Sequence, residues 1–71
     1  MSDRLDRAIL AAHDADDRPA LVALYTSAAD HCAAPGAQAY FLTIAYVYAL
    51  ETGDPLAEQL QARLRMMGRE H

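Results

Sequence analysis

The stretch that decides the fold runs from Ala39 to Leu50 and reads Ala-Tyr-Phe-Leu-Thr-Ile-Ala-Tyr-Val-Tyr-Ala-Leu, interrupted only by Thr43. Wound as a helix, this stretch has no polar face. A helix that is apolar all round is either buried in a protein or crosses a membrane. A membrane crossing takes about 20 apolar residues, which is more than this stretch supplies. We therefore expect it to be the central helix of a small soluble domain, covered by the rest of the chain.

Length and composition predict a single all-α domain over residues 1–71. Alanine and leucine, both strong helix formers, dominate the sequence, and no stretch alternates cleanly between apolar and polar residues. A domain of this size buries only about 60% of its unfolded surface. Because Cys32 is the only cysteine, no internal disulfide can stabilise the domain. Regular helix packing or a partner chain must do so.

Three sequence signals mark where helices begin. Either Ser2 or Asp3 can cap the first helix, and Asp3 also suits its positive end. Asp17, followed by Pro19, is typical of the residues that start a second helix. Asp54-Pro55 starts the last helix in the same way. The chain therefore has at least three helix starts, each with a polar cap.

Proline and glycine mark where helices end. Ala34-Pro35-Gly36 stops the second helix, since proline lacks an N–H donor and glycine permits a left-handed turn. Gly53 and Gly68 end the third and fourth helices by the same argument. The chain is thus predicted to form four short antiparallel helices over about residues 3–14, 18–33, 37–52 and 55–67.

The two halves of the chain have similar patterns of small and large residues. A shift of 37 residues aligns Leu5 with Leu42, Ala8 with Ala45, Ala12 with Ala49, Asp17 with Asp54, and Ala20 with Ala57. Because alanine is common in this chain, chance is the alternative explanation for some matches. Either two stacked helical hairpins or a compact four-helix bundle would accommodate the pattern.

The second half resembles a tetratricopeptide repeat. In that family a helix with small and aromatic residues leads through a Gly-Asp turn to a second helix with an early alanine. Tyr46, Ala49, Gly53-Asp54 and Ala57 correspond to these features. The first half matches less well, through Ala8, Ala12, Asp17 and Ala20. The turn is shorter than in the family, and no proline follows the fourth helix. The resemblance implies two degenerate helical repeats that bind protein or peptide and carry no catalysis.

The charge pattern argues against nucleic acids and membranes as partners. The formal net charge is −4 and all six basic residues are arginines, with no continuous basic stripe. Arg63, Arg65 and Arg69 lie where cations stabilise the negative end of the fourth helix. The first residues are charged, which is unlike a secretory signal, and the single cysteine suits a reducing cytoplasm. Absence of lysine beside abundant alanine and arginine is typical of bacterial proteins from GC-rich genomes.

The polar clusters do not have the spacing that chemistry requires. Residues 14–17 hold three aspartates, but a calcium loop also needs a glycine and a distal glutamate. His31 and Cys32 are neighbours, which point about 100° apart on a helix. His13 and His71 do not provide the closely spaced pairs of ligands that a tetrahedral zinc site needs. We therefore expect no catalytic, cofactor-binding or metal-binding residue, and no enzyme.

The aromatic side chains are the best candidates for an interaction surface, because tyrosine is enriched at interfaces. Only three helices are available to cover the central one. One of its faces, either Tyr40 with Val47 or Phe41 with Tyr48, is therefore expected to meet another chain. The predicted interaction surface consists of Tyr40, Phe41, Ile44, Val47 and Tyr48.

The sequence is thus interpreted as a helical protein–protein interaction module that binds protein or peptide and forms a homodimer through its central helix. A regulatory or structural subunit of a larger partner is an alternative. A second alternative is a small-molecule binder with a pocket between the second and third helices, lined by Leu24, Tyr25 and Tyr46.

Overall fold

A computed structural model describes residues 3–68, which form four α-helices and contain no strand. The helices are α1 (Asp3–Asp14), α2 (Arg18–Asp30), α3 (Pro35–Thr52) and α4 (Leu56–Met66). The all-α prediction is confirmed. Arg69 and His71, which entered the sequence predictions, lie outside the described residues.

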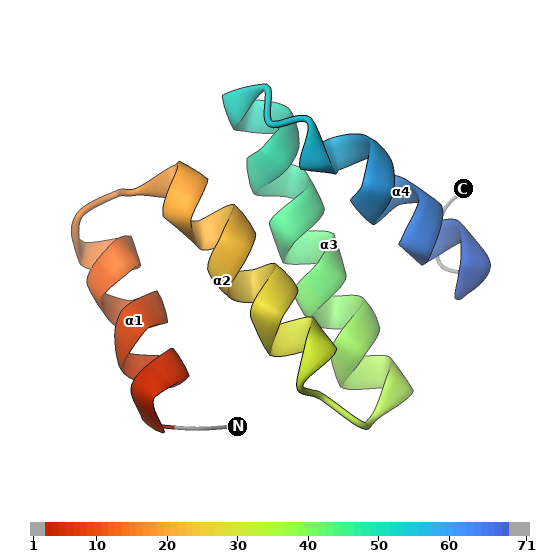
Figure 1. Cartoon of the computed structure of the whole chain (residues 1–71), viewed down its shortest axis with the longest axis horizontal. Coiled ribbons are helices and arrows are strands. Elements are labelled where there is room, and N and C mark those ends of the chain that lie inside the picture. The colour runs from red at the N-terminus through yellow and green to blue at the C-terminus, as the bar shows by residue number, and fades with distance from the viewer. Residues whose placement is uncertain (1–2, 69–71) are drawn as a thin grey trace.

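The helices are arranged as a thin layer in chain order. Consecutive helices run antiparallel, with α2 between α1 and α3, and α3 between α2 and α4 (Figure 1). The Cα positions extend over 31 × 28 × 14 Å, so the layer is about one helix thick. In residues 3–68, the backbones of α1 and α4 do not approach each other, as they would in a closed bundle. The helices therefore follow the predicted hairpin arrangement.

The core forms where α2 and α4 pack against α3. Each turn of α3 contributes a small or branched apolar residue, and Leu42, Ala45 and Ala49 are completely buried. Alanine side chains allow neighbouring helix backbones to approach closely, which suits a layer of this thickness. The same cluster takes Val22 and Ala29 from α2 together with Leu60 and Leu64 from α4. Every buried side chain among the described residues is apolar.

The aspartates predicted at the starts of α2 and α4 accept hydrogen bonds from backbone amides there. A carboxylate oxygen of Asp17 accepts a hydrogen bond from the amide of Ala20 at 3.3 Å. Asp54 accepts from the amide of Leu56 at 2.9 Å, just before α4. Gly53 has a φ of 68°, a left-handed conformation that glycine adopts without steric cost. These local signals place the turns between the helices.

The turn between α2 and α3 corrects the predicted boundaries. α2 ends at Asp30 instead of residue 33, and α3 begins at Pro35 instead of residue 37. Ala34 is extended, as is usual before proline, and Pro35 occupies the first turn of α3, where its missing N–H does no harm. Cys32 therefore lies in the turn and is half-buried, with its thiol 3.7 Å from the carbonyl oxygen of Ala34. The predicted second helix, which ran to residue 33, would have included Cys32, and this part of the prediction was wrong.

None of the helices in the described part of the chain is both long enough and apolar enough to cross a lipid bilayer. α3 is the longest of them, and its core residues face α2 and α4.

Truncation of Leu42 should test how far the fold depends on the core of α3. Leu42→Ala is expected to lower the free energy of unfolding by about 3 kcal/mol, because it leaves a cavity in a fully packed site. Leu10→Ala, at a position that is 64% exposed, should change it by less than about 0.5 kcal/mol. Urea denaturation of both variants followed by circular dichroism measures the difference. Equal losses would contradict the central position of α3 in the core.

Candidate functional site

One face of α3 carries apolar side chains that no other helix in the described part of the chain covers. Tyr40 is 64% exposed, Val47 49% and Leu50 58%. Gly36 and Thr43 are exposed on the same face. Alternating spacings of four and three residues place the five positions along one side of a helix. We call this surface the outer stripe; it consists of Gly36, Tyr40, Thr43, Val47 and Leu50.

The outer stripe contains two of the five residues predicted for the interaction surface. Tyr40 and Val47 are exposed together, whereas Phe41, Ile44 and Tyr48 are half-buried. The structure thus separates the two faces that the sequence left open: one faces solvent and the other faces the α1–α2 side. Leu50 was missed by the prediction. Its position three residues after Val47 continues the spacing and could have identified it.

The half-buried face of α3 belongs to an aromatic cluster that joins three helices. Nε2 of His13, from α1, lies 2.8 Å from the phenol oxygen of Tyr25, from α2. The His13 ring also meets Tyr48 of α3 edge-on, with centroids 6.2 Å apart. Tyr25 and Tyr48 stack with an interplanar angle of 17°. His13 therefore ties α1 to α3, a role that the sequence reading did not assign to it.

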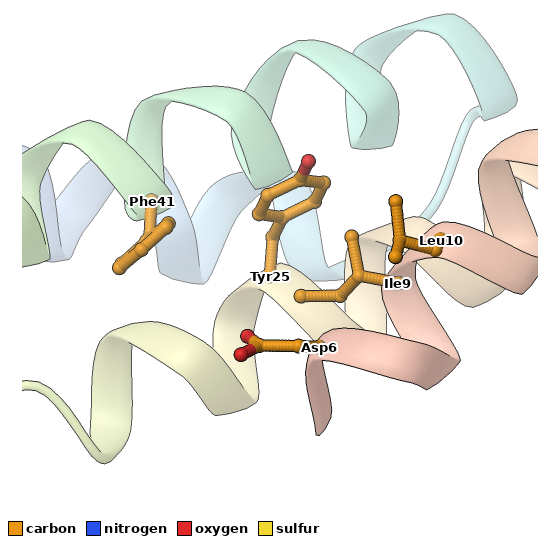
Figure 2. A pocket seen from close by; sticks show the side chains of 5 residues that line it. All are labelled: Asp6, Ile9, Leu10, Tyr25 and Phe41. Atoms are coloured by element: carbon orange, nitrogen blue, oxygen red, sulfur yellow. The ribbon is translucent and has the colours of Figure 1, made fainter. Parts of the chain in front are cut away.

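An open groove of about 380 Å³ lies beside this cluster, between α1 and α3 (Figure 2). Its lining consists of Asp6, Ile9, Leu10, Tyr25 and Phe41. Among the described residues that line the groove, Asp6 is the only charged one, and it comes from the exposed side of α1. A surface with one carboxylate and otherwise mainly apolar groups suits contact with an apolar segment, since it offers no convergent set of polar groups.

This groove differs from the pocket that was predicted between the second and third helices. Tyr25 lines it, but Leu24 and Tyr46 do not. Tyr46 packs instead against the core cluster.

The polar side chains around Asp16 and His31 make contacts with nearby residues of the chain. Asp16 forms an ion pair with Arg18 at 3.4 Å, and the ring of His31 lies 2.8 Å from the carbonyl oxygen of Ser27. Among residues 3–68, no group of three or more histidine, cysteine or acidic side chains is placed to hold a metal ion.

A further ion pair joins α4 to α2. Arg63 contacts the carboxylate of Asp30 at 2.7 Å, on the surface of the layer. The guanidinium thus bridges two helices whose backbones do not approach each other, at the end of α4 where cations were expected.

No protein-family model, curated protein or solved structure matches the chain. What is established is therefore the small domain of four helices and the geometry of its surfaces. The likeness to a tetratricopeptide repeat rests on the residues quoted for it.

The aromatic cluster perturbs the ionisation of Tyr25. Burial raises the pKa of the Tyr25 phenol above its ordinary value of 10.0, and the neighbouring phenols of Tyr48 and Tyr40 raise it further. The folded protein therefore holds the Tyr25 proton at pH values where the unfolded chain has lost it.

Stability should consequently fall in alkaline solution. As the pH rises above about 10, the unfolded chain releases the Tyr25 proton before the folded protein does, which favours unfolding. Tyr25→Phe should lose less stability over the same range, because it has no phenol to titrate. Urea denaturation at several alkaline pH values measures this for both proteins. An equal decline in the two would contradict a special role for Tyr25, and Tyr46→Phe serves as the matched control.

Proposed function

We propose that this protein is a small helical protein–protein interaction module that self-associates through the outer stripe of α3. The observation that carries the proposal is the exposure of Tyr40, Val47 and Leu50 along one side of a helix whose other sides are packed. Monomeric soluble proteins rarely expose a large contiguous apolar patch, and such patches usually mark interaction sites.

The pattern of the outer stripe favours a helix as the partner. Spacings of three and four residues are those of the seam between two packed helices. No charged side chain occurs between residues 35 and 50, so a second apolar helix can approach along most of α3 without desolvating a charge. The α3 helix of a second copy of the chain is a partner helix of this kind.

A second copy is also the partner that symmetry favours. Most oligomers of identical chains are two-fold dimers, in which the same surface patch is used by both copies. A domain of this size gains stability from association, since it buries a small share of its surface when alone. One contact between two copies would therefore cover the exposed apolar side chains of α3. It would also add buried apolar surface to a domain that has a small core.

A peptide of another protein is the second candidate, and the groove between α1 and α3 favours it. The groove presents Ile9, Leu10 and Phe41 to an apolar segment, with Asp6 at its edge. The resemblance to a tetratricopeptide repeat points to the same class of partner. In this case the chain would act as a regulatory or structural subunit of a larger protein.

Sedimentation equilibrium over a wide concentration range tests the proposal. The wild type is expected to shift from monomer to dimer as its concentration rises. Val47→Glu should raise the dimer dissociation constant at least about 10-fold, because the interface would bury a charge. Ala62→Glu adds the same charge to an exposed position of α4 and should leave the constant unchanged.

Circular dichroism should give the same helix content for all three proteins, since Val47 and Ala62 both lie on the surface. A wild type that stays monomeric at every concentration would refute self-association and leave the partner-subunit candidate. Equal effects of the two substitutions would remove the outer stripe from the proposal.

A further inference from the structure

We propose that the two copies pack antiparallel along their outer stripes, about a two-fold axis that passes beside Thr43. The inference rests on the proposed self-association and adds the orientation of the second copy. Thr43 lies at the middle of the stripe, with Tyr40 and Val47 on either side of it, and Gly36 and Leu50 further out.

The sizes of the side chains are complementary in the antiparallel orientation. Tyr40 of one copy falls opposite Val47 of the other, and Leu50 falls opposite the first turn of α3, where Gly36 has no side chain. Open space surrounds the position that a Gly36 side chain would occupy, so a bulky group can enter there. The parallel orientation would instead set Gly36 against Gly36 and Leu50 against Leu50. That pairing leaves a gap at one end of the seam and crowding at the other.

The charges favour the same orientation. Glu51 is the first charged residue after the stripe, and its carboxylate is loosely held by Arg18, 3.7 Å away. In a parallel pair the two Glu51 carboxylates would meet beside the axis and repel. In an antiparallel pair each one approaches the start of the other copy's α3. The amides there have no side-chain cap at Ala34, and the positive end of a helix attracts a carboxylate.

Disulfide trapping distinguishes the orientations. Tyr40→Cys and Val47→Cys are each made in a chain with Cys32→Ser, and the two proteins carry tags of different mass. In an antiparallel dimer of the Tyr40→Cys variant, the two introduced cysteines lie about seven residues, or about 10 Å, apart along the direction of the helices. A disulfide spans at most about 7 Å between Cα atoms, so these two cysteines cannot form one. Cross-linking is therefore expected in the mixture of the two variants and not in either one alone. Ala62→Cys, on the exposed side of α4, is the control and should not cross-link.

Other results overturn the inference in separable ways. Cross-linking of each variant with itself would establish the parallel orientation and leave the proposed self-association intact. A dimer by sedimentation that gives no cross-link in any combination would place the contact away from the outer stripe. A monomer at all concentrations, with no cross-link, would refute both the orientation and the proposed function.

Glu51→Gln tests the orientation independently of the cross-linking, through the direction in which the dissociation constant changes. In the antiparallel dimer it removes two symmetric contacts, one at the start of each copy's α3, so the dissociation constant should rise about 3- to 30-fold. In a parallel dimer it removes a repulsion, so the constant would fall. Sedimentation of wild type and variant at low salt measures the direction, and a fall would overturn the antiparallel orientation. Glu58→Gln, on the exposed surface of α4, is the matched control.

Discussion

The structure depends on one constraint: α3 is apolar on every side, but within residues 3–68 only α2 and α4 pack along its length. α2 and α4 cover the side that holds Leu42, Ala45 and Ala49. α1 lies beyond α2, and the His13 ring on α1 reaches Tyr48 of α3 across it. The remaining side of α3 is the outer stripe. Its exposure thus follows from the order of the helices in a single layer (Figure 1).

Alanine makes this layer possible. With alanines at the helix contacts, the backbones of α2, α3 and α4 approach closely and bury a core that contains few bulky side chains. The consequence is a small buried surface, since each alanine removes little apolar area from water. The aromatic side chains are half-buried or exposed instead, in the His13–Tyr25–Tyr48 cluster and, at Tyr40, in the outer stripe. The small core therefore leaves apolar surface for a partner, and binding of a partner to the folded form stabilises it.

The candidate site was predictable in part. Helical spacing alone identified Tyr40 and Val47 as members of one face, and Phe41 and Tyr48 as members of another. It could not tell which face is covered, because α3 has no polar side to mark the direction of solvent. Nor could it assign His13, which acquires its contact with Tyr25 only when α1 folds back beside α2.

The sequence by itself determined the four helices, the turn residues Asp17, Gly53 and Asp54, and the apolar character of α3, since these depend on residues that are close together along the chain. Asp17, Gly53 and Asp54 act on the backbone within a few residues, and the structure has them in those roles. The tertiary structure alone decided that the layer is open and that Tyr40, Val47 and Leu50 remain uncovered. The physical reason is that exposure depends on which helices come to lie beside α3, and local sequence signals do not contain that information.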